Sequence, residues 1–178
     1  MKKFICLFIL VFVFFENTEA QSVDFEPVKV DVLIGLGASK SGFNLMFGIE
    51  PKYNFKNNLC AGIKWELADI YRVGDFVTTS GPNGTVNSFI FTGELYAWHD
   101  IRVRPFIGAG SGIYLANFDV DKNQGISSKL GFMLRTGLQI GHFRVVAEKN
   151  FIPDSAFNLD YFTLKLGTTF GGGKRKML

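Results

Sequence analysis

The sequence of 178 residues has two cysteines and two histidines, and no segment keeps the apolar spacing of an amphipathic helix over a useful length. Cys6 lies in an N-terminal apolar run, so the rest of the chain has one thiol, Cys60, and can form no internal disulfide. The sequence also lacks a His/Cys cluster of the kind that holds zinc. We therefore expect no disulfide-stapled domain, no metal site and no cofactor.

Neither positive nor negative charge is in excess outside the C-terminal end. The chain carries 19 Lys and Arg residues against 16 Asp and Glu residues. Lys174, Arg175 and Lys176 account for the excess, and once they and residues 1–20 are set aside, both signs are equal in number. A domain without a basic face is not expected to bind nucleic acid, and three terminal cations are too few for such a module.

The N-terminal residues have the pattern of an export signal. Lys2 and Lys3 precede an apolar run over residues 4–15, and Ala20 stands before Gln21. The run has the length of a signal-peptide core and is too short to cross a bilayer as a helix. We predict a cleaved signal peptide over residues 1–20, with a retained anchor as the alternative.

The rest of the chain alternates apolar and polar residues with the period of a β-strand. The alternation predicts eight strands, at residues 28–36, 43–53, 59–70, 88–98, 105–115, 129–140, 143–150 and 159–170. Most have about the nine to eleven residues that a tilted strand needs to cross a membrane.

One face of each strand is rich in Phe, Leu and Ile, and the other collects charge. Eleven charged residues share the polar faces: Lys29, Asp31, Glu50, Lys52, Lys64, Glu66, Glu94, Arg135, Arg144, Glu148 and Lys165. Six are cations and five are anions, so they can largely pair. A soluble sandwich or lipocalin would hide the apolar face, whereas a transmembrane barrel exposes it to lipid and encloses the polar one.

The connections agree with a barrel. Short links are expected at residues 54–58, 99–104 and 141–142, and longer ones at 71–87, 116–128 and 151–158. Outer-membrane barrels have short periplasmic turns and longer extracellular loops. The sequence thus predicts an all-β fold, an eight-stranded antiparallel transmembrane up-and-down β-barrel over residues 28–170. Residues 21–27 would be a short N-terminal segment and residues 171–178 a Gly-rich basic periplasmic tail.

Two segments resemble a known family. RPFIGAGSGIY (104–114) and YFTLKLGTTF (161–170) are similar to strands of the small eight-stranded bacterial outer-membrane β-barrels, the porin-like X, W and A-barrel type. The resemblance implies a place in the bacterial outer membrane, contact with its lipids, and insertion by the barrel-assembly machinery. It also implies that the closing strand carries the assembly signal, in Phe162, Leu164, Leu166 and Phe170.

The candidate catalytic and nucleotide-binding patterns are weak. No helix follows GAGSG (108–112), so its glycines more simply make room for side chains inside the barrel. Some barrels of this family trim lipid A with a His-x-Ser pair. Here His99 and His142 are followed two residues later by Ile101 and Arg144, so a nucleophile beside a base is missing and we expect no enzyme.

Two roles remain open. The first is a structural or surface-interaction barrel with a salt-bridged lumen, whose long loops contact an extracellular partner. The second is a narrow porin or a carrier for small or hydrophobic solutes. An eight-stranded barrel is only just wide enough for its own side chains, which favours the first role. A soluble binder is a third possibility, and the oligomeric state is left open.

Overall fold

A computed structural model describes residues 26–39, 42–71, 84–97, 103–120, 123–153 and 160–172. The expected signal peptide, His99 and the basic tail from Lys174 lie outside these residues, as does most of the link expected at residues 71–87. The signal peptide and the tail therefore stay predictions. Among the described residues no helix is long and apolar enough to cross a membrane.

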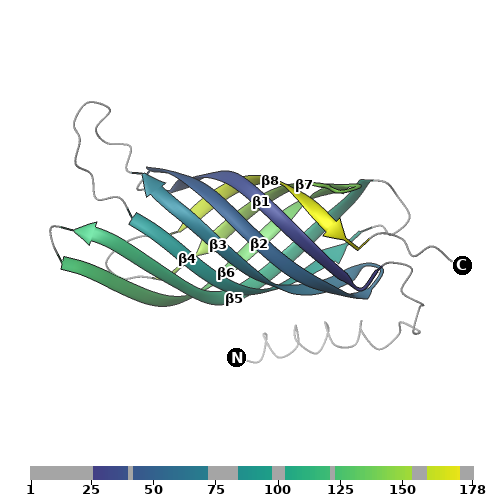
Figure 1. The fold of residues 1–178 in the computed structure, drawn as a ribbon, viewed down its shortest axis with the longest axis horizontal. Coiled ribbons are helices and arrows are strands. Elements are labelled where there is room, and N and C mark those ends of the chain that lie inside the picture. Colours follow the sequence, from purple (N-terminus) through teal and green to yellow (C-terminus); the bar gives the residue numbers. More distant parts are fainter. Residues whose placement is uncertain are drawn as a thin grey trace, which may run out of the picture.

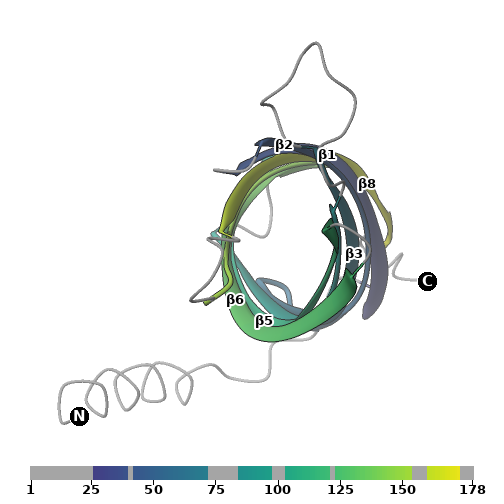
Figure 2. The same ribbon diagram turned by 90° about the vertical axis from the view of Figure 1, so that its left-hand side faces the viewer.

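Eight strands form one closed antiparallel barrel, in which each strand pairs with the next along the chain (Figures 1 and 2). Antiparallel pairing of β1 with β8 closes the ring. The strands are β1 (Val28–Ser39), β2 (Gly42–Lys56), β3 (Leu59–Tyr71), β4 (Gly84–Tyr96), β5 (Val103–Val120), β6 (Asn123–Ile140), β7 (Phe143–Phe151) and β8 (Tyr161–Gly171). The predicted fold is confirmed, and each of the eight predicted segments overlaps one of these strands.

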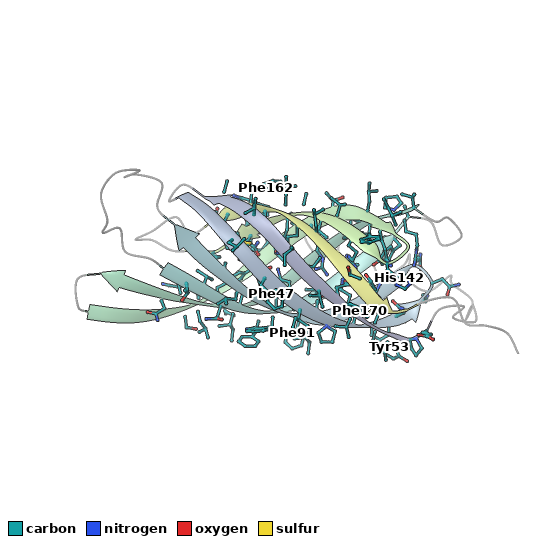
Figure 3. All side chains as sticks on the ribbon, turned by 45° about the horizontal axis from the view of Figure 1, so that its top comes forward. Phe47, Tyr53, Phe91, His142, Phe162 and Phe170 are labelled. Atoms are coloured by element: carbon teal, nitrogen blue, oxygen red, sulfur yellow. The ribbon has the colours of Figure 1, made fainter. Side chains whose placement is uncertain are left out.

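The alternating polar and apolar residues of each strand face the inside and the outside of the barrel, respectively. Charged residues such as Asp31, Glu50 and Arg144 are buried in the interior, while the apolar residues between them face outward and are exposed. Exposed Phe, Leu, Ile, Val, Trp and Tyr side chains occur on all eight strands. Figure 3 shows outward aromatic rings along the wall, from Phe162 to Tyr53 and Phe170. This is the reverse of a soluble core, as a lipid-facing wall requires.

The two ends of the barrel differ. The turn end, as we call it, carries the tight turns at residues 57–58 and 141–142, together with the first residue of β1 and the last of β8. At the opposite end, the loop end, the β5–β6 hairpin extends past its neighbours (Figure 1). Pairing of β6 with β7 stops at Phe132 and Phe151, so among the described strands residues 123–131 pair with β5 alone.

The prediction of a loop at residues 116–128 is therefore wrong. Most of it is paired strand, from Ala116↔Ser127 to Val120↔Asn123. The segment is rich in Asn, Asp and Ser, which gives a weak strand signal because β-branched and aromatic residues are few. Backbone hydrogen bonds to the adjacent strand hold a hairpin that the side-chain pattern does not reveal.

Several inward glycines leave space for a long neighbouring side chain. A Cβ on Gly62 would lie 2.6 Å from Cγ of Lys52, and a Cβ on Gly35 would lie 2.6 Å from Cγ of Lys165. A Cβ on Gly108, in the GAGSG segment, would lie 3.1 Å from Cγ and Nε of Arg135. These glycines let buried charged side chains cross the interior close to the wall.

We expect Gly62→Ala to destabilise the barrel, because the added methyl group meets both Lys52 Cγ and the Pro51 carbonyl oxygen at 2.6 Å. The cost of such overpacking is about 1–3 kcal/mol. Gly93→Ala is the matched control, since a Cβ there has no neighbour within 4 Å. Urea unfolding in lipid vesicles measures both; equal midpoints for the two variants would contradict the packing role of Gly62.

Candidate functional site: the charged interior of the barrel

The eleven predicted interior charges are all buried inside the barrel. They come from every strand except β5, which turns Phe106, Gly108 and Tyr114 inward and whose Arg104 guanidinium lies 4.3 Å from the centre of the Tyr96 ring. Seven of the eleven lie toward the turn end and four lie nearer the middle. The ion pairs of ten of them stay within these two groups, and Lys29 joins the first group through Tyr96. We call these the turn-end cluster and the central cluster.

The turn-end cluster contains Lys29, Asp31, Glu50, Lys52, Glu94, Arg135 and Arg144. Arg135 grips Glu50 with two parallel hydrogen bonds, from Nη1 to Oε2 at 2.7 Å and from Nη2 to Oε1 at 2.6 Å. Such forked pairing is the strong geometry of guanidinium with carboxylate. The hydroxyl of Thr92 also donates to Glu50, so both carboxylate oxygens are engaged.

Glu94 and Asp31 connect the remaining cations of this cluster. Arg144 donates from Nη2 to Glu94 Oε1 at 2.5 Å and from Nη1 to Asp31 Oδ2 at 2.6 Å. Lys52 Nζ lies 2.6 Å from Asp31 Oδ2 and 2.8 Å from Glu94 Oε2. Each carboxylate therefore faces more than one cation, which compensates for the water that burial removes.

Lys29 is the excess cation of the turn-end cluster. Its Nζ donates to Tyr96 Oη at 2.9 Å and lies 4.6 Å from the centre of the Tyr96 ring. The Tyr96 hydroxyl donates in turn to Glu94 Oε2 at 2.9 Å. Tyr96 thus links the excess cation to the carboxylates, through a hydrogen-bond relay and the negative face of its ring.

The central cluster is a closed ring of two lysines and two glutamates. Lys64 Nζ lies 2.5 Å from Glu148 Oε1 and 3.1 Å from Glu66 Oε2, and Lys165 Nζ lies 2.9 Å from Glu148 Oε1 and also pairs with Glu66. Tyr161 donates to Glu66 Oε1 at 3.2 Å. Two positive and two negative charges make this ring neutral.

Two of the ion pairs join opposite walls. Glu50 is on β2 and Arg135 on β6, four strands apart in a ring of eight. Lys64 on β3 and Glu148 on β7 are also four strands apart. Side chains that meet across the lumen from opposite walls obstruct it at that level. The lumen is thus crossed by ion pairs at two levels.

The interior also holds apolar side chains, most of which the sequence analysis did not place there. Met46, Ile90, Tyr114, Met133 and Tyr161 belong to one buried cluster. A second contains Leu33, Cys60, Tyr96, Phe106 and Val146. Position could have found several of them, because Leu33, Ile90, Met133 and Val146 each lie two or four positions from a buried charge on the same strand.

The other candidate residues are placed as follows. His142 is exposed in the turn at residues 141–142, and its Nδ1 lies 2.9 Å from the Thr169 carbonyl oxygen. The Cys60 thiol is buried and lies 3.5 Å from Glu94 Oε2. Within the described ranges no group of three His, Cys, Asp or Glu could hold a metal ion. That the chain is not an enzyme stays a prediction.

Phe162, Leu164, Leu166 and Phe170 all point outward from β8 and are exposed. Phe170 lies at the turn end, one residue before β8 finishes, in the neighbourhood of Tyr53 and His142 (Figure 3). Their placement is that of a lipid-facing stripe on the closing strand, and their use as an assembly signal stays a prediction.

Comparison with solved structures decides the fold family. Neisserial surface protein A is similar, with 16% identity and a TM-score of 0.63 over 81% of this chain and 95% of that chain. The N-terminal β-barrel domain of Pseudomonas aeruginosa OprF is similar with 12% identity and a TM-score of 0.53 over 82% and 99%. This chain has the fold of the small eight-stranded outer-membrane β-barrels.

A third barrel of this fold is the outer membrane protein OprG from Pseudomonas aeruginosa, with 8% identity and a TM-score of 0.52 over 84% of this chain and 99% of that chain. No protein-family model and no curated protein sequence matches. The relationship is therefore one of strand number, closure and size, carried by almost no shared sequence.

We expect loss of Glu50 to cost more stability than loss of Arg135. The turn-end cluster has four cations and three carboxylates, so Glu50→Gln widens the imbalance whereas Arg135→Met removes it. Breaking a buried ion pair from one side costs about 3–5 kcal/mol, which we expect for Glu50→Gln. Unfolding in vesicles measures both variants and their combination, whose cost should be less than the sum.

Glu26→Gln is the control, because it removes the same charge from an exposed residue ahead of β1. Its effect should stay within about 0.5 kcal/mol. Equal costs for Glu50→Gln and Arg135→Met, or strict additivity in the double variant, would contradict the charge balance described for this cluster.

Proposed function

We propose that the chain is an integral protein of the bacterial outer membrane, with a structural or surface-interaction role and a lumen closed by ion pairs. The observation that carries the proposal is the contact of Arg135 with Glu50 and of Lys64 with Glu148 across the barrel. Side chains that meet across the interior stabilise the wall and obstruct passage. The protein then acts through its outer surface.

The outward wall supports the membrane location. Exposed apolar side chains cover all eight strands, and closure of β1 on β8 removes the strand edges that lipid cannot satisfy. The three structural neighbours described above are outer-membrane proteins. By the usual orientation, the turn end faces the periplasm and the loop end faces outward.

The β5–β6 hairpin is the described element best placed for surface contacts. Beyond Phe132 its β6 strand has only β5 as a partner among the described strands, and the hairpin projects furthest at the loop end (Figure 1). Polar, small residues dominate this projection. A surface-interaction role would use this hairpin together with the links at the same end.

A narrow porin or a carrier is the alternative function, and conductance separates the two. We expect the purified barrel to migrate in a heat-modifiable way from the membrane fraction and to give no single-channel steps in planar bilayers. Shortening Glu50, Arg135, Lys64 and Glu148 to Ala removes the pairs that span the lumen at both levels, so steps should appear in that variant.

Two results would overturn this proposal. Recovery of the protein in the soluble periplasmic fraction without detergent would contradict the membrane location. Reproducible steps in the unaltered protein that vanish when Arg135 or Glu94 is neutralised would contradict the closed lumen and favour the porin.

We further propose that the closing strand is the segment read during membrane assembly, with Phe170 as its terminal aromatic residue. Phe170→Ala should lower the fraction of folded barrel in the outer membrane of a bacterial host. Phe91→Ala is the matched control, because both rings are outward and exposed, by 59% for Phe170 and 71% for Phe91. Heat-modifiable mobility measures the folded fraction.

Refolding into protein-free vesicles distinguishes recognition from stability. If Phe170 is read by the assembly machinery, Phe170→Ala and Phe91→Ala should refold equally well in such vesicles and differ only in cells. Equal assembly of the two variants in cells would contradict a special role for Phe170.

A further inference from the structure

An apolar groove runs along the outside of the barrel over the seam where the ring closes. It has a volume of about 800 Å³. It is bounded mainly by outward residues of β1 and β8, with Gly35, Gly37 and Lys165 at its base and Leu45 of β2 and Val145 of β7 at its sides. Ligand pockets commonly measure about 300–1,000 Å³. The groove is therefore large enough for an elongated apolar molecule, and its walls offer such a molecule almost no polar atom.

Strand register divides this part of the wall into rows of side chains that face the same way. The row nearest the loop end joins Lys149 of β7, Phe162 of β8 and Ala38 of β1. The next two rows consist of Ala147, Leu164 and Leu36, and then of Val145, Leu166 and Ile34. One charged residue, Lys149, thus stands at the head of the apolar rows.

Lys149 is positioned to reach a headgroup. It is partly exposed, and its Nζ lies 5.7 Å from the ring centre of Phe151, the next outward residue toward the loop end. Its ammonium group is thus directed away from the apolar rows. A basic side chain that extends along the wall to a polar region is the usual arrangement near a membrane interface.

The apolar rows are short enough to fit within the depth of one leaflet. Val145 and Lys149 are four residues apart, which on a tilted strand is about 10 Å of membrane depth. One leaflet of the hydrocarbon core is about 15 Å thick. The apolar rows therefore span less than the depth of one leaflet, and Lys149 lies at their loop-end side.

We propose that this groove, headed by Lys149, binds a phosphate-bearing lipid of the outer leaflet, with an acyl chain along β1 and β8 and the phosphate at the Lys149 ammonium group. The proposal rests on the orientation given under the proposed function. Apolar contact alone does not select a lipid, because neighbouring lipid tails are as apolar as the wall. Selectivity then comes from the fit of one chain in the groove and from the cation above it.

Asp160 is an acidic residue near the proposed phosphate position, and its negative charge would repel a phosphate. It precedes β8 at the same end, and its Oδ1 accepts a hydrogen bond from the Ile152 backbone N–H at 2.9 Å. A carboxylate near the headgroup opposes an anionic lipid. Removal of that charge in Asp160→Asn should therefore strengthen binding, opposite in sign to removal of Lys149.

Native mass spectrometry of the purified barrel tests the proposal with dimyristoyl phosphatidic acid as the probe. Dimyristoyl phosphatidylcholine, of the same chain length, and dihexanoyl phosphatidic acid, of the same headgroup, are the comparison lipids. We expect Lys149→Ala to weaken the binding of the first lipid about fivefold, the change that about 1 kcal/mol per basic residue near the membrane surface gives. Binding of the choline lipid should not change, and Lys149→Arg should restore the preference.

A second variant tests the groove itself. Ala38→Trp places a large side chain in the row of Phe162 and should weaken both long-chain lipids, whereas Ala109→Trp puts the same side chain on the outside of β5, across the barrel. Lys129→Ala is the control for charge, on the β5–β6 hairpin. Heat-modifiable mobility shows that each variant is folded.

Three outcomes would overturn the proposal. The first is an unchanged preference for phosphatidic acid in Lys149→Ala. The second is equal binding by Ala38→Trp and Ala109→Trp. The third is a dimer that excludes lipid and that Ala38→Trp dissociates. A second copy of the chain would then occupy the groove. Because the binding assay needs only a folded barrel, its failure is distinct from failure of the membrane fractionation.

Discussion

Closure of the sheet through β1 and β8 is the constraint on which the rest of the structure depends. In lipid a strand edge leaves backbone donors and acceptors without partners, so the ring has to close. Eight strands give a narrow circumference, and a narrow ring brings opposite walls within reach of two long side chains. The contacts of Arg135 with Glu50 and of Lys64 with Glu148 are consequences of that geometry.

The same constraint explains how so many charges are tolerated in a small interior. Each buried charge costs several kcal/mol of desolvation, at order of magnitude, unless partners surround it. The central cluster balances two cations with two anions, and the turn-end cluster leaves one cation in excess, Lys29. That excess sits near the start of β1, at the end of the barrel, and Tyr96 connects it to Glu94. The excess positive charge of this cluster thus lies close to the rim of the barrel at the turn end.

Period-two alternation was enough to predict all eight strands and the inward set of charges, because in a barrel each side chain has only two possible environments. It failed at residues 116–128, a segment with few β-branched and aromatic residues that pairs as a hairpin. It could not predict which charges pair, since Glu50 and Arg135 meet only through the curvature of the closed ring. The interior apolar residues, such as Ile90 and Met133, were missed because apolar character was read as outward facing.

The inward and outward faces of the strands are constrained differently, and this difference bears on function. Inward residues are tied to one another through ion pairs across the lumen, so a change at one of them disturbs several strands at once. Outward residues contact lipid and few other side chains, and they can differ without disturbing closure. A protein of this fold therefore has freedom to acquire specific contacts on its wall and at its loop end. The groove headed by Lys149 and the β5–β6 hairpin lie in those two regions, which is where a specific role of this chain should be sought.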